Sequence, residues 1–489
     1  MRIRIIIPLL ITSACLILPY FSDVFACLVF IAIALLLYFS QTISSKKNKI
    51  IFIVLSISIW HLVVLFWFNH DYSVSLMDTL SIIVLSITIL LFFLLLFFFF
   101  SRYVGRYYPI LFINIWMLYE IMLVEWDIPF PMLSLGSVFG NFAPVIQWYS
   151  ITGVFGGTLW ILLVNFLFLE LFINRKITVP LPLILVIPII ISCIMYFNRR
   201  EESGKNMSVI VVNNNLENNN YFDKTIDLLY KDKDDNVKLI VCPEGLFDIS
   251  DRSFQVNRYF SAIKRLLQSN YNQAELIIGG ELKSIEKSSN NSALYFNLAV
   301  LLNSNGMVAF RNKKILVPFG EIIPYKKIFG KSENIKKAVK KEISYLPAYD
   351  TIFNRRNCKV LPLICYELYF GNKIRNYAVQ NDFDIICCLS NEYAIPTKAY
   401  YKQFNRMSRI QAISFQCPVI KSTIHGNSLI VKSEGDIIKT AYNTNEILKR
   451  TVILKSVNTY YKKLGYKAAI SLWGIFIFLF ILKERLCLK

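Results

Sequence analysis

The sequence predicts a multi-span α-helical membrane domain joined to an α/β sandwich domain. The first indication is composition: 55% of the 489 residues are hydrophobic, with 38 Phe and 27 Tyr, which is too apolar and too long for one soluble domain. The second is uneven charge. Residues 1–200 carry few charges and long Ile/Leu/Phe runs, whereas residues 201–460 read as an ordinary polar globular sequence. A further apolar stretch follows within residues 461–489.

Eight apolar stretches are long enough to cross about 30 Å of hydrocarbon. They lie near residues 5–21, 23–41, 50–68, 76–101, 108–125, 150–174, 178–197 and 466–483. The basic start of the chain followed by an apolar run could be a signal peptide, but no small-residue cleavage site is obvious, so we interpret it as an uncleaved first helix. Pro19 and Ser22-Asp23 separate this helix from the second.

Basic residues orient these spans through the positive-inside rule. If Arg2 and Arg4 are cytoplasmic, the same side receives the basic residues of three loops and of the C-terminal tail, namely Lys46, Lys47, Lys49, Arg102, Arg106, Arg175, Lys176, Lys483, Arg485 and Lys489. We therefore predict seven transmembrane helices within 1–200, an extracytoplasmic domain over 201–460, and a C-terminal transmembrane helix with a short cytoplasmic tail over 461–489.

The outer 126–149 loop is apolar and aromatic without helical continuity. Two interpretations are open, a re-entrant or surface-lying segment and a simple aromatic belt at the membrane interface. Gly153, Gly156 and Gly157 open the next helix, where small residues allow close helix packing.

Charge and cysteine usage exclude several classes of function. The formal net charge of +20 is spread over membrane-flanking loops and the soluble part without an arginine-rich stripe, so we expect anionic headgroups and no nucleic acid as partner. The ten Cys have no framework spacing, and most are expected to be small buried hydrophobes. The three His are widely separated, so no metal site and no cofactor are expected.

Strands alternating with helices predict an α/β sandwich from Ser208 onward. Strands are expected near 208–212, 238–242, 275–280, 294–302, 307–311, 359–365, 384–389, 418–423, 427–432 and 449–454, and helices near 221–233, 253–268 and 398–416. A hairpin turn is expected at Asn303-Ser304-Asn305-Gly306. The strands are continuous apolar runs, as expected when both faces of a sheet are covered.

Three stretches carry candidate chemistry. The run Leu361–Leu368 rises to Cys365 where a buried strand gives way to a loop, a common place for a nucleophile. A Cys nucleophile needs a base or a cationic environment, because the thiolate is the reactive form. Glu244, at the end of another strand, could be the base, and Lys313 could stabilise the thiolate and an oxyanion. A solvated Glu and an exposed Lys-Lys edge are the ordinary alternatives.

These stretches resemble the Glu-Lys-Cys triad of the nitrilase superfamily. The resemblance rests on Pro243-Glu244, on Lys313 eight residues before Glu321 in a Lys-x-x-Leu-Val-Pro-Phe-Gly-Glu pattern, and on Ile364-Cys365-Tyr366-Glu367. The eight spans, and the stretch from Gln147 to Asn165, narrow it to the apolipoprotein N-acyltransferase family of bacterial enzymes. The resemblance implies a nitrilase-like αββα sandwich for residues 201–460.

The resemblance also implies roles for individual residues. Glu244 would be the general base, Cys365 the nucleophile and Lys313 the oxyanion stabiliser, with Lys314 as the neighbouring alternative. Three further residues would support them, Glu321 and Glu367 as acidic groups and Tyr366 through its backbone N–H in the oxyanion hole.

The implied reaction is acyl transfer from a membrane phospholipid to the N-terminal amine of the diacylglyceryl-cysteine of apolipoproteins, through a Cys thioester. The resemblance also implies a monomeric multi-pass protein of the bacterial inner membrane with its catalytic domain on the periplasmic side. A membrane-tethered nitrilase-type amidase and a receptor or scaffold built on an inactive fold are the alternatives. The chain departs from the family after Asn391, where Glu392-Tyr393-Ala394-Ile395-Pro396 replaces a segment with Trp-Phe-Gly. This departure puts lid behaviour and substrate preference in doubt.

Overall fold

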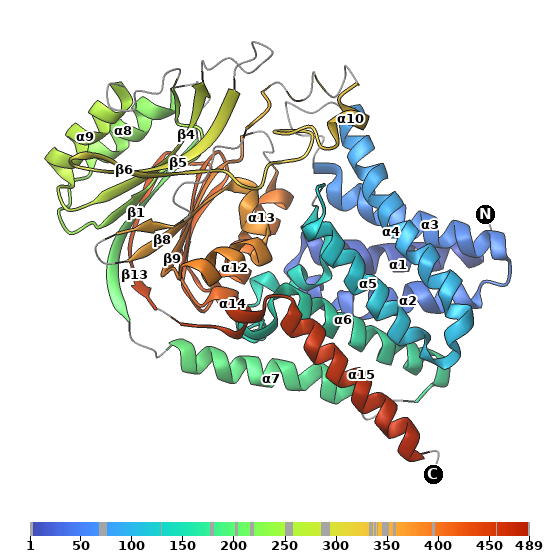
Figure 1. Cartoon of the computed structure of the whole chain (residues 1–489). Helices are drawn as coiled ribbons and strands as arrows, with labels where there is room; N and C mark the ends of the chain where they lie inside the picture. Colours follow the sequence, from blue (N-terminus) through green and yellow to red (C-terminus); the bar gives the residue numbers. More distant parts are fainter. Residues whose placement is uncertain are drawn as a thin grey trace. The chain divides into compact units, whose positions relative to one another are not determined.

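The chain forms two compact units in a computed structural model (Figure 1). Unit 1 comprises Met1–Asn198, Thr397–Arg406 and Leu464–Lys489, and unit 2 comprises Arg199–Pro396 and Met407–Lys463. The structure describes residues 3–67, 76–128, 130–176, 180–200, 204–215, 220–249, 258–284, 294–331, 336, 339, 341–344, 352–355, 358–393, 397–455 and 457–487.

Long apolar helices build the membrane part of the chain. They are α1 (Ile3–Phe21), α2 (Val29–Thr42), α3 (Lys46–Leu65), α4 (Leu76–Val104), α5 (Tyr108–Glu125), α6 (Tyr149–Asn174), α7 (Pro180–Arg200) and α15 (Lys467–Cys487). Six spans of the described chain are long and apolar enough to cross a membrane, and they coincide with predicted spans two to seven. The apolar helices at the first and last predicted spans, Ile5–Phe21 and Lys467–Phe478, are shorter. The chain is therefore a helical membrane protein, and its total of eight spans stays a prediction.

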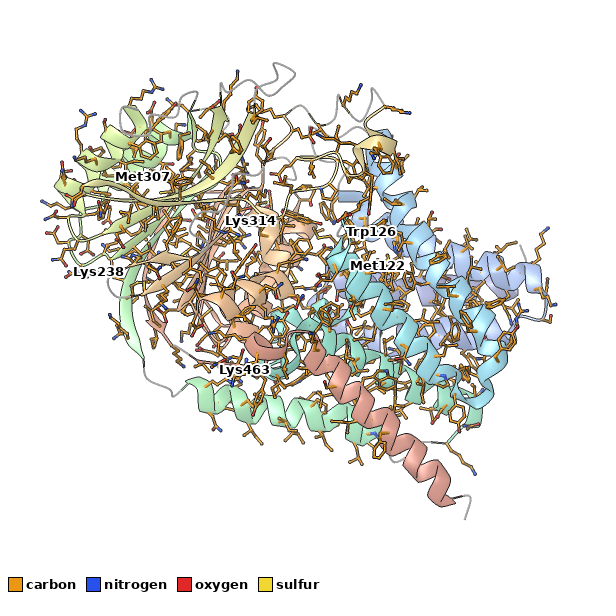
Figure 2. The ribbon with its side chains drawn as sticks, in the orientation of Figure 1. Met122, Trp126, Lys238, Met307, Lys314 and Lys463 are labelled. Carbon is orange, nitrogen blue, oxygen red and sulfur yellow. The ribbon has the colours of Figure 1, made fainter. Side chains whose placement is uncertain are left out.

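The loop between α5 and α6 folds into three short 3-10 turns, η4 (Pro131–Leu133), η5 (Leu135–Asn141) and η6 (Ala143–Val145). Figure 2 labels Met122 and Trp126 at the end of α5, where this loop begins. Glu120 is buried on α5, and its carboxylate accepts hydrogen bonds from Ser134 Oγ at 2.8 Å, from the Leu135 N–H at 2.9 Å and from Thr158 Oγ1 at 2.7 Å. A buried carboxylate is stable only when it is hydrogen-bonded in this way, so Glu120 fixes the loop to α5 and α6.

Close packing of the loop against α6 explains one of the predicted small residues. The hydroxyl of Tyr149 donates to the carbonyl of Gly136 at 2.8 Å. A Cβ atom at Gly157 would lie 1.9 Å from that hydroxyl, so a larger residue there would break the contact. The loop is therefore a packed part of unit 1. Its contacts are more specific than those expected of a simple aromatic belt.

Unit 2 contains thirteen strands in its described residues. They are β1 (Lys205–Asn214), β2 (Leu239–Val241), β3 (Phe247–Ile249), β4 (Glu275–Ser284), β5 (Leu294–Asn303), β6 (Gly306–Asn312), β7 (Phe353–Asn354), β8 (Lys359–Ile364), β9 (Ile385–Asn391), β10 (Val419–Ile424), β11 (Asn427–Val431), β12 (Ile437–Tyr442) and β13 (Glu446–Leu454). Their main order is β6-β5-β4-β2-β1-β10-β9-β8-β7. β13 pairs with β1, β3 with β4, and β11 with both β10 and β12.

Two hydrophobic cores stabilise this arrangement. One core joins the two halves of the strand path and includes Val211, Ile277, Ile364 and Ile420. The other lies between the first half and α8 (Tyr221–Lys231) and α9 (Arg258–Asn270), which lie together over the strands in Figure 1. The remaining helices are α10 (Lys326–Phe329), α12 (Gly371–Gln380), α13 (Lys398–Phe415) and α14 (Tyr460–Leu464). The αββα sandwich is confirmed.

Strand direction positions the site. β2, β1, β10, β9 and β8 are successive neighbours in the order, and every pair along this path is parallel. The carboxyl ends of parallel strands meet at one edge of a sheet, where α/β folds bind ligands. Glu244 follows β2, Ser390 and Asn391 end β9, and Cys365 follows β8, so all of them lie at this edge.

Candidate active site

Cys365 occupies a strained turn at the end of β8. The strand ends at Ile364, and a 3-10 turn, η7 (Cys365–Tyr369), begins at the cysteine itself. The φ angle of Cys365 is +47°, in the left-handed region that non-glycine residues rarely adopt. Such strain persists only where the surroundings enforce it, and it is frequent at active sites. The thiol is half-buried.

Glu367 enforces this turn from two residues away. Its carboxylate accepts the backbone N–H groups of Ile364 and of Lys314, each at 2.8 Å, and so joins the turn to the segment after β6. Lys314 is labelled in Figure 2. The Arg311 guanidinium pairs with both carboxylate oxygens, Nη1 to Oε2 at 2.6 Å and Nη2 to Oε1 at 2.9 Å. Burial acts to raise the pKa of Glu367, but the Arg311 charge and these hydrogen bonds hold it below its usual value.

Glu244 comes directly after β2 and is buried. Its Oε1 accepts from Asn297 Nδ2 at 2.7 Å, and its Oε2 accepts from the backbone N–H of Asn391 at 3.1 Å. The backbone at Glu244 passes so close to β4 that a Cβ at Gly279 would lie 2.6 Å from the Glu244 Cα, so glycine is required there.

Lys313 lies between two acids. Its side chain is 1% exposed, and Nζ is 3.4 Å from Glu244 Oε1 and 2.7 Å from Glu321 Oε1. Glu321 Oε2 also accepts the N–H of Val317, which folds the Lys313–Glu321 segment into a compact loop. Burial acts to lower the pKa of Lys313, but Glu244 and Glu321 raise it overall, so the ammonium stays charged.

The charges around Cys365 favour a resting thiol. Burial, with help from the nearby negative charge of Glu244, raises the pKa of the Cys365 thiol to about 12, against the opposing charge of Lys313. Burial also raises the pKa of Glu244, although Lys313 opposes it. A thiolate therefore does not accumulate at neutral pH, and its formation needs a base within the site. The assignment of Glu244 as that base stays a prediction.

The sequence-predicted residues fall into two connected groups. Glu244, Lys313 and Glu321 share hydrogen bonds, and Glu367 lies at the turn that begins with Cys365. Tyr366 is buried in that turn, and the role of its backbone N–H stays a prediction. The Lys314 N–H bonds Glu367, while the Lys313 ammonium meets Glu244, which favours Lys313 for the predicted role.

Sequence reasoning missed several groups that complete the site. They are Arg311, which pairs with Glu367; Asn297, which donates to Glu244; Ser390, whose Oγ lies 3.5 Å from Cys365 Sγ; and the buried pair of Lys421 with Glu392 at 2.7 Å. Arg311, which directly follows the apolar residues Met307–Phe310 of β6, was a usable signal, because buried charges are almost always paired. The Ala394–Pro396 part of the divergent segment lies outside the described residues.

Comparisons with known proteins match both parts of the chain. The apolipoprotein N-acyltransferase N-terminal domain family matches residues 13–167, and the carbon-nitrogen hydrolase family matches residues 214–462. Apolipoprotein N-acyltransferase of Haemophilus influenzae is 25% identical over 352 residues, 68% of this chain and 66% of that protein. The enzyme of Rickettsia prowazekii is 25% identical over 358 residues, 70% of this chain and 69% of its own length. The matched region thus spans about two thirds of these relatives.

Solved structures also align with this chain. A carbon-nitrogen hydrolase superfamily protein of Xanthomonas campestris aligns with a TM-score of 0.38 and 16% identity, over 50% of this chain and 90% of its own. A nitrilase-superfamily protein of Saccharomyces cerevisiae aligns with a TM-score of 0.39 and 13% identity, over 54% of this chain and 96% of its own. The family matches, which together run from residue 13 to residue 462, decide the assignment. The chain belongs to the carbon-nitrogen hydrolase superfamily, in the apolipoprotein N-acyltransferase family that joins this domain to a helical membrane domain.

Proposed function

We propose that this protein transfers an acyl chain from a membrane phospholipid to the N-terminal amine of the diacylglyceryl-cysteine of apolipoproteins, a step of lipoprotein maturation. The observation that carries the proposal is the half-buried Cys365 thiol at a strained strand end: Ser390 Oγ lies 3.5 Å from its sulfur, and the next residue, Asn391, donates its N–H to the carboxylate of the buried Glu244–Lys313 pair. This is the arrangement that covalent acyl transfer requires, a nucleophile with an adjacent base and a cation for the developing oxyanion.

The first half-reaction forms a thioester. Glu244 takes the proton of the Cys365 thiol as the sulfur attacks the ester carbonyl of the phospholipid. The carbonyl oxygen becomes an oxyanion, which the Lys313 ammonium and the Tyr366 N–H stabilise. When the intermediate collapses, the C–O bond breaks, and the departing alkoxide takes the proton from Glu244 and leaves as lysophospholipid.

The second half-reaction transfers the acyl group to nitrogen. The α-amino group of the diacylglyceryl-cysteine attacks the thioester carbonyl, and Glu244 takes a proton from the attacking nitrogen. The C–S bond then breaks, and the thiolate recovers its proton from Glu244. An amide is more stable than a thioester, so this step drives the sequence forward. Glu321 keeps Lys313 in place, and Glu367 keeps the turn at Cys365 in place.

Lipid substrates explain why the catalytic domain is joined to a membrane domain. Both acyl donor and acceptor are anchored in a bilayer, so the enzyme must receive them there and exclude water from the thioester. We place the protein as a monomer in the bacterial inner membrane, with unit 2 on the periplasmic side, because the positive-inside rule favours that orientation.

The rate of thioester formation is expected to fall as the pH falls. Glu244 acts only as a carboxylate, and burial raises its pKa above the usual value for Glu. Protonation of Glu244 therefore removes the base, and the acid limb of the rate profile lies at higher pH than an exposed Glu would give. Single-turnover acylation measured from pH 4 to pH 8 checks this. A rate that stays constant down to the pH at which exposed Glu titrates would contradict the assignment of Glu244 as base.

Labelled lipid tests the function. The full-length protein in detergent is mixed with phospholipid carrying a labelled acyl chain, and the expected result is one acyl group per protein on the Cys365 peptide, released by hydroxylamine. Adding a diacylated lipopeptide should move the label to its N-terminal amine. If the protein instead releases free fatty acid or ammonia at the same rate with and without lipopeptide, it is an amidase or hydrolase. If no adduct forms and no product appears, the inactive-fold interpretation holds.

A further inference from the structure

A third buried ion pair, besides Arg311–Glu367 and Lys313–Glu244, is linked to the proposed nucleophile. Lys421 on β10 and Glu392 just after β9 are both 0% exposed in their side chains, and Nζ is 2.7 Å from Oε1. A buried pair of charges is costly to desolvate, so it rarely adds stability over an apolar pair of similar size. The hydroxyl of Ser390 links this pair to the site, because its Oγ lies 3.5 Å from Glu392 Oε1 and 3.5 Å from Cys365 Sγ.

The Ser390 hydroxyl has one proton and two neighbours. A separation of 3.5 Å is long for a hydrogen bond between two oxygens, but it suits a bond to the larger sulfur atom. The better acceptor is therefore Cys365 Sγ, above all when the sulfur carries negative charge. Ser390 is completely buried, so water does not compete for this proton.

The residues around Ser390 are held at both ends. The Ser390 carbonyl accepts the Glu244 N–H at 3.4 Å, and the Asn391 N–H donates to the Glu244 carboxylate at 3.1 Å. Glu392 fixes the next position through Lys421 and through its own N–H, which donates to the Ile424 carbonyl at 2.9 Å. The 390–392 segment therefore contacts the proposed base and the proposed nucleophile together.

Gly426 makes room for this arrangement. A Cβ atom at this position would lie 2.2 Å from Glu392 Oε2. Its φ angle of +124° also disfavours any other residue. The loop after β10 is thus shaped around the Glu392 carboxylate.

We infer that Ser390 donates a hydrogen bond to the Cys365 thiolate and that the Lys421–Glu392 pair is the positioning device that holds Ser390 there. The inference rests on the proposed role of Cys365 as nucleophile. Ser390 lowers the free energy of the thiolate in the acylation step and again when the thiolate leaves in the second half-reaction. Glu392 and Lys421 touch no reacting atom and act through Ser390 and Asn391.

Alkylation of the thiol tests Ser390 without any lipid. The full-length protein is treated with iodoacetamide from pH 6 to pH 10, and modification of the Cys365 peptide is followed by mass spectrometry. Below the pKa of the thiol, the rate is proportional to the thiolate fraction. Ser390→Ala should alkylate about 10- to 100-fold more slowly over the whole range, because one hydrogen bond to a charged acceptor is lost. Ser422→Ala is the matched control, because Ser422 is buried on β10 but donates to the Val212 carbonyl.

The ion pair is tested by removing both charges at once. Lys421→Met leaves Glu392 buried and unpaired and is expected to damage folding, whereas Lys421→Met with Glu392→Leu keeps the packing without any charge. This double variant should unfold near the temperature of the parent protein. Its Cys365 thiol should still be alkylated at least about 10-fold more slowly than that of the parent. Parent-like alkylation in the folded double variant, or in Ser390→Ala, would overturn the inference. Because alkylation requires no acyl donor, it separates this outcome from a failure of the proposed acyl transfer.

Discussion

Replacement of Cys365 by Ala should abolish the acyl-enzyme adduct and lower acyl transfer by about 10⁴- to 10⁶-fold, the usual cost of removing a catalytic nucleophile. Ala lacks the sulfur that forms the covalent bond. Because Cys365 already has a left-handed backbone, Ala keeps the same strain and the turn is expected to fold. The loss therefore reports on chemistry and not on folding. Labelled phospholipid, with product counted on a lipopeptide, measures both half-reactions.

Cys417→Ala is the control for this experiment. Cys417 is completely buried like a core residue, and its backbone N–H donates to the carbonyl of Ala412 on α13 at 3.2 Å. The Cys417→Ala substitution should lower stability through a small cavity but keep the rate of acyl transfer within about threefold of the parent. Full transfer by Cys365→Ala would show that the acyl chain passes directly from lipid to amine, and the thioester pathway would be wrong.

The parts of the site that sequence could predict are those with local patterns. Cys365 ends an apolar run, Glu244 ends another, and Lys313 and Glu321 lie eight residues apart in one loop. Each of these can be recognised within a short window. The strand interiors of unit 2 were also predictable, because continuous Ile, Leu and Val runs fill both cores.

The missed parts depend on contacts between distant segments. Arg311 meets Glu367 across 56 positions of sequence, and Lys421 meets Glu392 across 29. No local pattern shows such a pairing. β12 was missed because its residues alternate irregularly in exposure, and α12 because only Ile374 among its residues is buried. Both elements are fixed by neighbours and not by their own periodicity.

Removal of Arg311 should destabilise unit 2 by about 3–5 kcal/mol, the usual cost of leaving one member of a buried ion pair alone. The guanidinium is completely buried and makes two hydrogen bonds to the Glu367 carboxylate. Arg311→Met leaves that carboxylate with the N–H groups of Ile364 and Lys314 as hydrogen-bond donors but without its cationic partner. Urea unfolding of the full-length protein in detergent, followed by tyrosine and tryptophan fluorescence, measures the loss. Lys326→Met is the matched control: its pair with Glu342 is 65% and 34% exposed, and its loss should cost at most about 1 kcal/mol.

The pH dependence of stability identifies the cause of this loss. The pKa of Glu367 is lowered in the folded protein. Its pair with Arg311 therefore contributes its full stability at pH values above the unfolded pKa of Glu. That contribution disappears as the pH falls through the lowered folded pKa. Arg311→Met should therefore lose most stability at neutral pH and little in acid, where the carboxylate is protonated in both proteins. A loss of equal size at both pH values would mean that Arg311 stabilises by packing against Tyr377, whose ring centre lies 5.3 Å from the guanidinium, and not by charge. The rate of acyl transfer by Arg311→Met should fall together with its stability, and only at neutral pH. The reason is that the ionised Glu367 carboxylate holds two backbone N–H groups at the site, that of Ile364 before Cys365 and that of Lys314 after Lys313.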